Sequence, residues 1–172
     1  MFSVDIKVLD ERLLSTFGGL PKPATSGAVG YDVMACTHYP RDMNGKPDLA
    51  ARRPILEPME IAGATQPTYI GLGFAMAGPA GYAALLVPRS GLGAARGLIL
   101  ANTIGVIDIA DYRGELIAAV ITRGGAGYII KPGEAIAQML LVPVPRFSWT
   151  LTEELPASER GAGGFGSTGV RR

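Results

Sequence analysis

Short apolar runs separated by turn-forming residues extend along most of the chain. At the N-terminus, apolar residues occupy every second position, at Phe2, Val4, Ile6 and Val8, which is typical of a strand with one face against a core. No segment sustains the 3.6-residue period of an amphipathic helix for three turns. The 24 Gly and 13 Pro residues punctuate the apolar runs. The pattern predicts an all-β fold.

Other segments with the same pattern predict further strands. We expect them at residues 27–35, 55–61, 68–76, 81–87, 98–101 and 135–144, and in a last core strand where Phe147, Trp149 and Leu151 alternate with polar residues. Residues 94–97 can add one helical turn between two strands. The polar, turn-rich segment 39–54 predicts a long surface loop.

The composition changes after Pro156, where residues 161–169 are rich in glycine. Glycine loses more backbone freedom than any other residue when it is ordered. We therefore expect residues 157–172 to form a mobile tail that a ligand orders. Residues 1–156 form the body of a single domain, since a chain of 172 residues can bury a core without disulfide or metal staples.

Composition and charge exclude several classes of protein. Charged residues make up 18% and hydrophobic residues 48% of the chain, which fits neither a disordered nor a membrane-spanning protein. The sequence shows neither an apolar run of about 20 residues nor a signal-peptide pattern. A net charge of +1 offers no broad field for a nucleic acid. We expect a soluble, cytoplasmic protein that binds neither nucleic acid polymers nor membranes.

Two residue types that often carry chemistry occur once each. Cys36 lies in an apolar stretch and has no partner for an internal disulfide, so we interpret it as a buried small hydrophobic residue. His38 has neither a second histidine with which to share a metal nor a serine partner at motif spacing. Both residues are interpreted as structural.

The segment from Asn102 to Glu115 carries more functional groups than a turn requires. Apolar residues lead into Asp108, Asp111, Tyr112 and Arg113, and Gly114 precedes another apolar run. A turn requires only residues such as Gly, Asn, Asp or Pro. We interpret the segment as a hairpin with chemistry at its tip, and a solvated surface turn is the alternative.

Three other stretches offer groups that suit phosphate oxygens. Residues 88–93 combine Arg89 and Ser90 with glycines that leave backbone N–H groups accessible. Gln138 lies within an apolar strand, and the tail contains Arg160, Ser167 and Thr168 beside the aromatic Phe165. Asp32 is a single carboxylate among apolar residues, which is costly to bury without a partner. The ligand implied is a base joined to several phosphates.

Five motifs in this order resemble those of the trimeric dUTP diphosphatases (dUTPases). They are Gly-Tyr-Asp at 30–32, Pro-Arg-Ser-Gly-Leu-Gly at 88–93, residues 102–115, Gly-Glu-Ala-Ile-Ala-Gln at 133–138, and the glycine-rich run at 160–169. The resemblance implies a jelly-roll-like, distorted β-barrel and a homotrimer with sites at subunit interfaces. It also implies Mg²⁺-assisted hydrolysis of dUTP to dUMP and pyrophosphate, which limits uracil in DNA and supplies dUMP for dTTP synthesis.

The resemblance also implies a role for each motif residue. Asp32 would hold Mg²⁺ through water, and Asp108 would orient the water that attacks the α-phosphate, with Asp111 as the alternative. The uracil and sugar would be read by Asn102, Gly105, Tyr112 and, closing over the base, Phe165. The phosphates would be bound by Arg89, Ser90, Gly91, Gln138, Arg160, Gly166, Ser167 and Thr168.

Two positions depart from the family pattern. One extra residue separates Asp108 from Tyr112, and Ala135 stands where the family usually has arginine. An extra residue in a regular strand would turn every following side chain to the other face. We therefore predict a bulge near Ile109 and Ala110 that keeps both Asp108 and Tyr112 facing the nucleotide.

Two other functions fit the same motifs. The chain could bind dUTP as a trimer with a regulatory or protein-binding role and weak hydrolysis, using the lengthened hairpin or the loop at 39–54. It could also be a relative of the dCTP deaminases, which share the fold. The tail motif and the tyrosine of the hairpin favour dUTP.

Overall fold

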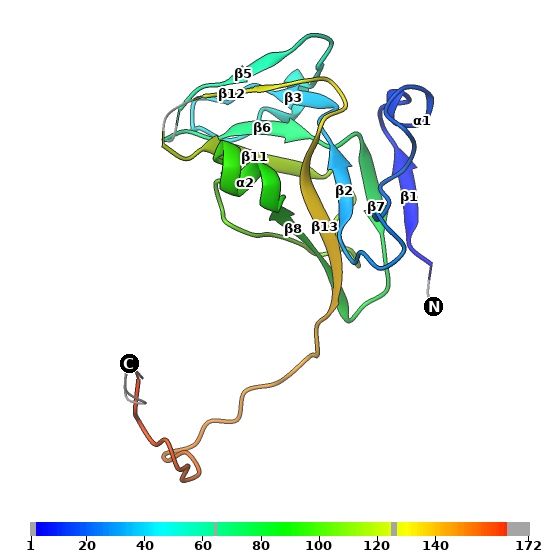
Figure 1. The fold of residues 1–172 in the computed structure, drawn as a ribbon. Helices are drawn as coiled ribbons and strands as arrows, with labels where there is room; N and C mark the ends of the chain where they lie inside the picture. The colour runs from blue at the N-terminus through cyan, green and yellow to red at the C-terminus, as the bar shows by residue number, and fades with distance from the viewer. Residues whose placement is uncertain (1–2, 64, 125–126, 165–172) are drawn as a thin grey trace.

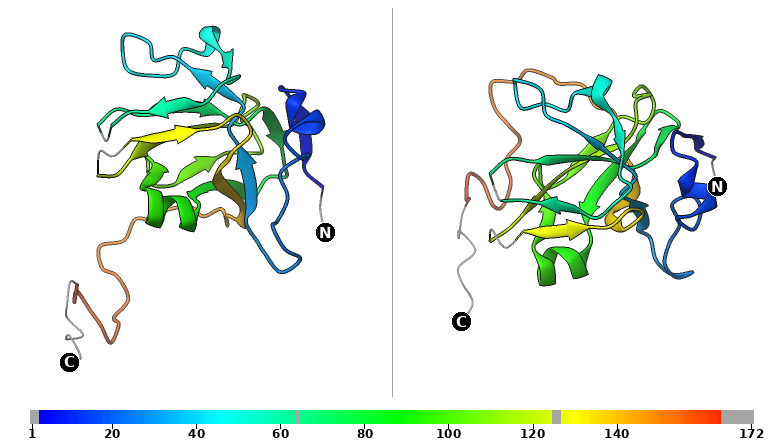
Figure 2. Two further views of the ribbon diagram at one scale, coloured as in Figure 1. Left: turned by 45° about the horizontal axis from the view of Figure 1, so that its top comes forward. Right: turned by 90° about the horizontal axis from the view of Figure 1, so that it is seen from above.

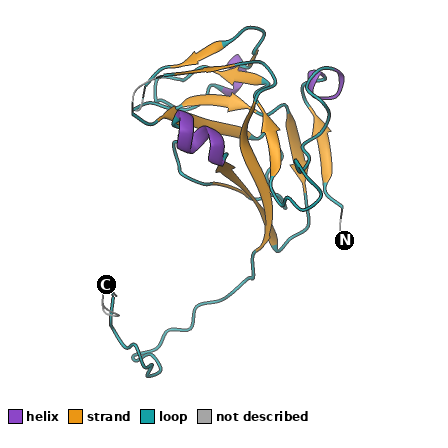
Figure 3. Ribbon diagram, viewed as in Figure 1, coloured by secondary structure: helices purple, strands orange, loops and turns teal. Residues whose placement is uncertain are grey.

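The computed structural model describes residues 3–63, 65–124 and 127–164, and its regular secondary structure is mostly β-strand. Figures 1 and 3 show the arrangement. The elements in chain order are β1 (Asp5–Val8), α1 (Arg12–Ser15), β2 (Tyr31–Met34), β3 (Thr37–Tyr39), the 3₁₀ helix η1 (Leu49–Ala51), β4 (Arg53–Pro54), β5 (Met59–Ile61), β6 (Thr68–Gly71), β7 (Phe74–Ala77), β8 (Tyr82–Pro88), α2 (Ser90–Arg96), β9 (Leu98–Leu100), β10 (Gly105–Ile107), β11 (Ile117–Thr122), β12 (Tyr128–Ile130) and β13 (Ala135–Pro143). The prediction of an all-β fold is confirmed.

Two larger antiparallel sheets supply most of the strands. One has the order β10-β8-β13-β2, and the other has the order β4-β3-β6-β11-β9. Strands β1 and β7 form a separate pair, as do β5 and β12. Neighbours in these sheets are mostly far apart in sequence, so long-range contacts rather than local hairpins determine the fold.

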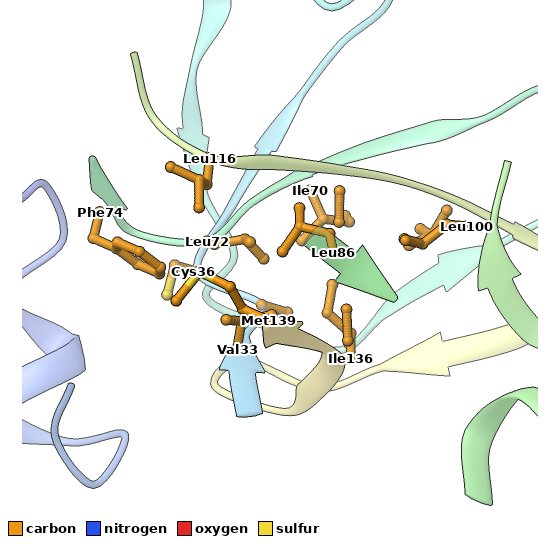
Figure 4. Close-up of a cluster of buried hydrophobic side chains, with 14 of the residues drawn as sticks. Val33, Cys36, Ile70, Leu72, Phe74, Leu86, Leu100, Leu116, Ile136 and Met139 are labelled. Carbon is orange, nitrogen blue, oxygen red and sulfur yellow. The ribbon is translucent and has the colours of Figure 1, made fainter. Parts of the chain in front are cut away.

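The core lies where side chains of both larger sheets meet (Figure 4). Val33 and Met139 come from one sheet and Ile70 and Leu100 from the other, and all four are buried. Cys36 belongs to the same cluster and has no exposed surface. The interpretation of Cys36 as a buried small hydrophobic residue is confirmed.

The strand expected at 68–76 is two strands in different sheets. β6 ends at Gly71 and β7 begins at Phe74. Gly73 lies between them with φ at +81°, and a Cβ there would come within 2.7 Å of Cys36 Sγ. Glycine permits this conformation and this close approach. The chain therefore turns out of the β6 sheet at Gly73 to pair with β1.

Several other boundaries differ from the expectation. The strands expected at 27–35 and 55–61 are shorter, because only β2 and β5 within them are regular. The segment 39–54 is a loop only between its ends, since β3 and β4 pair across it and η1 forms inside it. α2 begins at Ser90, inside the segment predicted to bind anions, rather than at residue 94.

Residues 102–115 do not form a hairpin. β10 pairs with β8, whereas β11 pairs with β6 and β9. The segment therefore leaves one large sheet and enters the other. The pattern of an apolar run, a turn and a second apolar run fits both arrangements, and the partners of each strand decide between them.

The last apolar strand that we expected is absent from the part of the chain that the structure describes. β13 ends at Pro143 and the following segment runs outward from the sheets (Figure 2). Phe147, Trp149 and Leu151 are 76%, 90% and 100% exposed, respectively. Ile6 of β1 is also exposed, at 37%, so the predicted buried face of the N-terminal strand is incomplete within one chain. Phe2 lies outside the described residues.

Among the described residues, none of the helices has the length and apolar character required to cross a membrane.

Candidate functional site

Three of the predicted site residues meet where β2, β13 and β8 lie side by side. In the register of the sheet, Gln138 is opposite Asp32 on one side and Val87 on the other. Arg89 follows directly after β8 ends at Pro88. The strand pairing thus brings together residues that are up to 106 positions apart.

The three side chains form a connected polar cluster. Gln138 Nε2 donates to Asp32 Oδ1 at 3.0 Å, and Arg89 Nη2 lies 3.3 Å from Asp32 Oδ2. Arg89 Nη1 also donates to the carbonyl of Ala135 at 2.7 Å. Ala135 is the residue that replaces the arginine usual in the fourth motif of the dUTPases that the sequence resembles. Asp32 therefore has a donor at each carboxylate oxygen and fixes Arg89 and Gln138.

α2 begins beside this cluster. Its N-cap is Arg89, whose side chain makes no capping hydrogen bond, so the first backbone N–H groups, at Ser90 and Gly91, have no partner within the helix. A Cβ added at Gly91 would meet no atom within 4 Å. The fold therefore gives no steric reason for glycine there, whereas the approach of a ligand to the backbone would.

The turn between β9 and β10 places Asn102 beside the start of β10. A Cβ at Gly105 would lie 3.2 Å from Leu86 Cβ and 3.7 Å from Asn102 Nδ2. Thr103 has φ at +65°, which is uncommon for a residue other than glycine. The turn is compact, since Ile104 N donates to Asn102 O at 2.6 Å.

The extra residue between Asp108 and Tyr112 is absorbed in a wide turn rather than in the strand bulge that we predicted. β10 ends at Ile107, and the backbone N–H groups of Asp111 and Tyr112 both donate to Asp108 O, at 2.9 and 2.8 Å. Ile109 has no exposed surface, and Gly78 N donates to its carbonyl at 2.9 Å. The buried Ile109 anchors a turn in which Asp108 and Asp111 are exposed.

Tyr112 is held against the chain that follows it. Its hydroxyl donates to the carbonyl of Glu115 at 2.9 Å, and a Cβ at Gly114 would come within 2.4 Å of that hydroxyl. Any larger residue at position 114 would therefore require the Tyr112 ring to move. Burial raises the pKa of Tyr112. Arg113 closes the turn from outside by donating to the carbonyls of Ile109, Ala110 and Tyr112.

The two groups of residues do not meet within one chain. β10 runs antiparallel to β8, with Gly105 opposite Leu86 and Ile107 opposite Ala84. Asp108 therefore lies near the start of β8 and Arg89 just beyond its end. The five steps along the strand from Ala84 to Arg89 span roughly 16 Å at about 3.3 Å each. Asn102 is on the Arg89 side of this span and Asp108 is on the far side.

The tail residues are only partly described. The segment that follows β13, residues 144–164, is here called the arm. Arg160 Nε donates to Gly163 O at 2.8 Å in an exposed turn of the arm. Phe165, Gly166, Ser167 and Thr168 lie outside the described residues. The assignment of these five residues to a nucleotide therefore stays a prediction, as does the division of the chain at residue 156.

Within residues 3–63, 65–124 and 127–164, no group of three or more His, Cys, Asp or Glu side chains could hold a metal ion. Asp32 is the carboxylate of its cluster, and both of its oxygens already have donors. A magnesium ion typically binds one or two carboxylates, retains several waters and uses the phosphates of its substrate. The donor set at Asp32 fits an ion that arrives with a nucleotide.

Neither Cys36 nor His38 has the environment of a reactive group. Burial raises the pKa of Cys36 to about 12, so the thiol stays protonated and inert. Burial, together with nearby Arg53, lowers the pKa of His38.

A buried ionic cluster around Glu115 did not follow from the sequence. Its carboxylate accepts hydrogen bonds from Thr37, Tyr39, Arg52 and the backbone of Gly73. The bond to Glu115 raises the pKa of Arg52, and burial followed by the same carboxylate raises that of Tyr39. The available signal was a charged residue directly before the apolar run that becomes β11.

Comparison with known proteins shows which family this chain resembles. The family model described as dUTPase matches residues 48–169. The deoxyuridine 5'-triphosphate nucleotidohydrolase of Bordetella avium is 43% identical over 169 residues, which cover 98% of this chain and 99% of that protein. The enzyme of the same name from Klebsiella pneumoniae is 41% identical over 170 residues, with 98% of each chain covered.

A solved structure supports the fold. A mutant dUTPase of Staphylococcus bacteriophage 80alpha with dUpNHpp matches with a TM-score of 0.73 at 23% identity, and the match covers 99% of this chain and 100% of that one. The long match to the family model and the 43% identity over nearly the whole length establish that this chain belongs to the dUTPase family.

Proposed function

We propose that this protein hydrolyses dUTP to dUMP and pyrophosphate. The observation that carries the proposal is the near-complete match to enzymes named deoxyuridine 5'-triphosphate nucleotidohydrolase. The structure has two clusters of polar residues, and they suit the phosphates and the nucleoside of that substrate, respectively. The cluster at Asp32 offers donors for phosphates, and the turn at 108–112 offers a carboxylate and an aromatic ring.

Asp108 is the proposed catalytic base. Its carboxylate is exposed, while its carbonyl is fixed by the N–H groups of Asp111 and Tyr112. Water is a poor nucleophile, and a carboxylate can position it and accept its proton. We assign to Asp108 the orientation of the water that attacks the α-phosphate, and contact with the sugar 3'-hydroxyl. Asp111, exposed in the same turn, is the alternative.

The phosphates are assigned to Arg89, Gln138 and the first residues of α2, Ser90 and Gly91. Arg89 and Gln138 already lie on Asp32, so little side-chain freedom remains to be lost when the nucleotide binds. Hydrogen bonds to charged groups contribute about 1.5–3 kcal/mol each. These donors neutralise the charge that develops in an in-line displacement.

Mg²⁺ is proposed as the cofactor, held by Asp32 through water. Both oxygens of Asp32 are engaged by protein donors. The carboxylate can therefore accept hydrogen bonds from the waters around Mg²⁺ more readily than it can displace those waters and bind the ion directly. When bound, the ion neutralises phosphate charge.

The active form is proposed to be a homotrimer with each site at a subunit interface. In one chain, roughly 16 Å of β8 separates the region of Asp108 from Arg89, so a second chain is needed to bring the proposed base, Asp108, to the phosphates. The exposed Phe147, Trp149 and Leu151 also require cover.

We place the arm of one copy in an apolar groove of about 460 Å³ on another copy. The groove is lined by residues of β1, β7, β2 and β13, among them Ile6, Tyr31 and Met76. β1 is paired on one side only, with β7. Its other edge can accept an added strand from the arm, whose apolar side chains alternate as a strand requires.

Base and sugar recognition is assigned to Asn102, Gly105 and Tyr112. The tail then closes the site: Phe165 covers the uracil, and Arg160, Gly166, Ser167 and Thr168 bind the γ-phosphate. A base stack contributes about 1–3 kcal/mol, which together with charge-assisted bonds can offset the ordering of a glycine-rich segment. A closed tail also excludes bulk water.

The direct test is release of pyrophosphate from dUTP with and without Mg²⁺, beside an ammonia assay with dCTP. Hydrolysis of dUTP that depends on Mg²⁺ supports the proposal. Tight binding of dUTP without turnover would replace it with a regulatory role, and ammonia from dCTP would replace it with deamination. Sedimentation of the same preparation measures the oligomeric state.

A further inference from the structure

The carboxylate of Glu115 is buried and fully engaged. Its side chain is 4% exposed. Thr37 Oγ1 and the N–H of Gly73 donate to Oε1 at 3.0 and 2.7 Å, and Arg52 Nε donates to Oε2 at 2.6 Å. The hydroxyl of Tyr39 also donates to Oε2. Donors from β3, from the segment after η1 and from the β6–β7 connection therefore converge on one side chain.

Burying such a cluster of charged and polar groups costs more free energy than filling the same volume with apolar side chains. Removing charges from water is expensive, and well-packed apolar residues often stabilise a fold as well or better. Buried polar networks can instead specify one conformation among several. Within the described residues, every buried side-chain nitrogen and oxygen has a hydrogen-bond partner, so this network fixes the orientation of Glu115 from several sides.

The backbone of the same residue holds Tyr112. The carbonyl of Glu115 accepts from the Tyr112 hydroxyl at 2.9 Å. The ring lies directly over Gly114, since a Cβ there would approach the hydroxyl to 2.4 Å and the ring carbon Cζ to 2.6 Å. The anchored side chain of Glu115 thus fixes the peptide that positions the ring.

Arg52 extends the connection to a distant part of the chain. Besides binding Glu115, its Nη2 donates to Leu9 O at 3.1 Å. Arg52 belongs to the long segment between β3 and β4 and lies 63 residues from Glu115. From this segment, Arg52 supplies the positive charge that lets the Glu115 carboxylate remain buried.

We propose that Glu115, with Arg52 as its counter-ion, is a positioning residue that sets the discrimination between deoxyribonucleotides and ribonucleotides by holding Tyr112. The inference rests on the proposed function, in which the Tyr112 ring lies under the deoxyribose and leaves no room for a 2'-hydroxyl. A ring tied at its hydroxyl cannot tilt to admit that group. Neither residue touches the substrate, and both act through Tyr112.

The test compares kcat/KM for dUTP with kcat/KM for UTP. In Glu115→Gln the amide keeps the size of the side chain and loses its charge, and the ratio of dUTP to UTP use is expected to fall at least tenfold, mainly through KM. Arg52→Lys keeps the charge but loses the planar fork, so a smaller fall of at least threefold is expected. An unchanged ratio in both variants overturns the proposal.

A matched control separates positioning from general loosening of the fold. Asp10 and Arg12 form a comparable ion pair at 2.6 Å with side-chain exposures of 8% and 25%, against 4% and 33% for Glu115 and Arg52. Asp10→Asn is expected to change the ratio less than twofold. A change as large as that of Glu115→Gln would show that any buried ion pair has the same effect, and the inference fails.

A double-variant cycle tests the route through the hydroxyl. Tyr112→Phe removes the bond to the Glu115 carbonyl, so Arg52→Lys in that background is expected to add less than twofold. A full additional effect overturns the route, and this cycle gives the answer even if Glu115→Gln does not fold.

Binding of dUDP and UDP to the same variants supplies a readout that needs no turnover. Wild-type protein that hydrolyses neither triphosphate would refute the proposed function. The ratio of the two diphosphate dissociation constants would still support or overturn the role of Glu115.

Discussion

Replacing Ile109 with alanine tests how the chain accommodates its extra residue. Ile109 is fully buried in the turn between Asp108 and Tyr112. It packs against Gly78 so closely that a Cβ at Gly78 would lie 2.4 Å from Ile109 Cδ1. The substitution removes three carbon atoms from this contact and leaves the backbone bond from Gly78 N to Ile109 O in place.

The magnitude follows from burial. Three buried carbon atoms at about 0.8 kcal/mol each give a transfer contribution of about 2.4 kcal/mol. The backbone bond limits collapse of the site, and the remaining cavity raises the loss of unfolding free energy to about 3–4 kcal/mol. For a chain of this size, each kcal/mol lowers Tm by about 2–4 °C. Ile109→Val should cost about 0.5–1.5 kcal/mol.

Denaturant unfolding at one fixed protein concentration measures the effect, because association into the proposed trimer would make stability depend on concentration. Ile129→Ala is the control, since Ile129 is 60% exposed on β12 and should lose less than about 1 kcal/mol. Equal midpoints for Ile109→Ala and the wild type would refute the view that the extra residue is a buried anchor.

Four further predictions concern the site, pH and assembly. Asp108→Asn should lower kcat by about 10²–10⁴ and Asp111→Asn by less than tenfold, and the opposite order would transfer the base to Asp111. Gly114→Ala should raise KM for dUTP because its methyl group overlaps the Tyr112 hydroxyl, and an unchanged KM would contradict this. The hydrogen bond from Arg12 lowers the pKa of Asp10, so wild type and Asp10→Asn should differ in unfolding free energy by a constant amount above about pH 5 and converge as pH falls through and below 3.8. Trp149→Ala should shift sedimentation towards smaller species, and an identical profile would show that the arm does not hold the assembly together.

The sequence predicted the strand content, because alternation is a local signal. It named Asp32, Arg89 and Gln138 as site residues but did not predict that their side chains contact one another. It did not predict that β10 leaves β11 and pairs with β8. The two apolar runs of that segment suit a hairpin equally well, and the choice depends on strands far away in sequence. The prediction of a strand bulge near Ile109 and Ala110 was wrong, because β10 ends at Ile107, before the extra residue.

The cluster at Glu115 lay beyond sequence reasoning because its donors come from distant positions. Tyr39 and Arg52 are 76 and 63 residues away, and a glutamate after a glycine ordinarily belongs to a solvated turn. The apolar alternation at Phe147, Trp149 and Leu151 predicted a core strand, and that prediction was wrong, since all three side chains are exposed. A sequence does not indicate whether an apolar surface is buried within its own chain, and the exposure of these residues is one ground for the proposed contact with another copy.

The exposed arm has a consequence for how copies can assemble. In the proposed assembly, the arm of one copy binds the groove of the next, and these are different surfaces. An open row of copies therefore leaves one arm and one groove unused at its ends. Contacts of this type close into a ring when the rotation between neighbours divides a full turn, and otherwise continue as a filament. For a ring of three, the extended segment after Pro143 must set a rotation of one third of a turn. In the proposed assembly, the length and direction of this segment therefore determine whether the copies form a closed ring or a filament, as well as whether each site is complete.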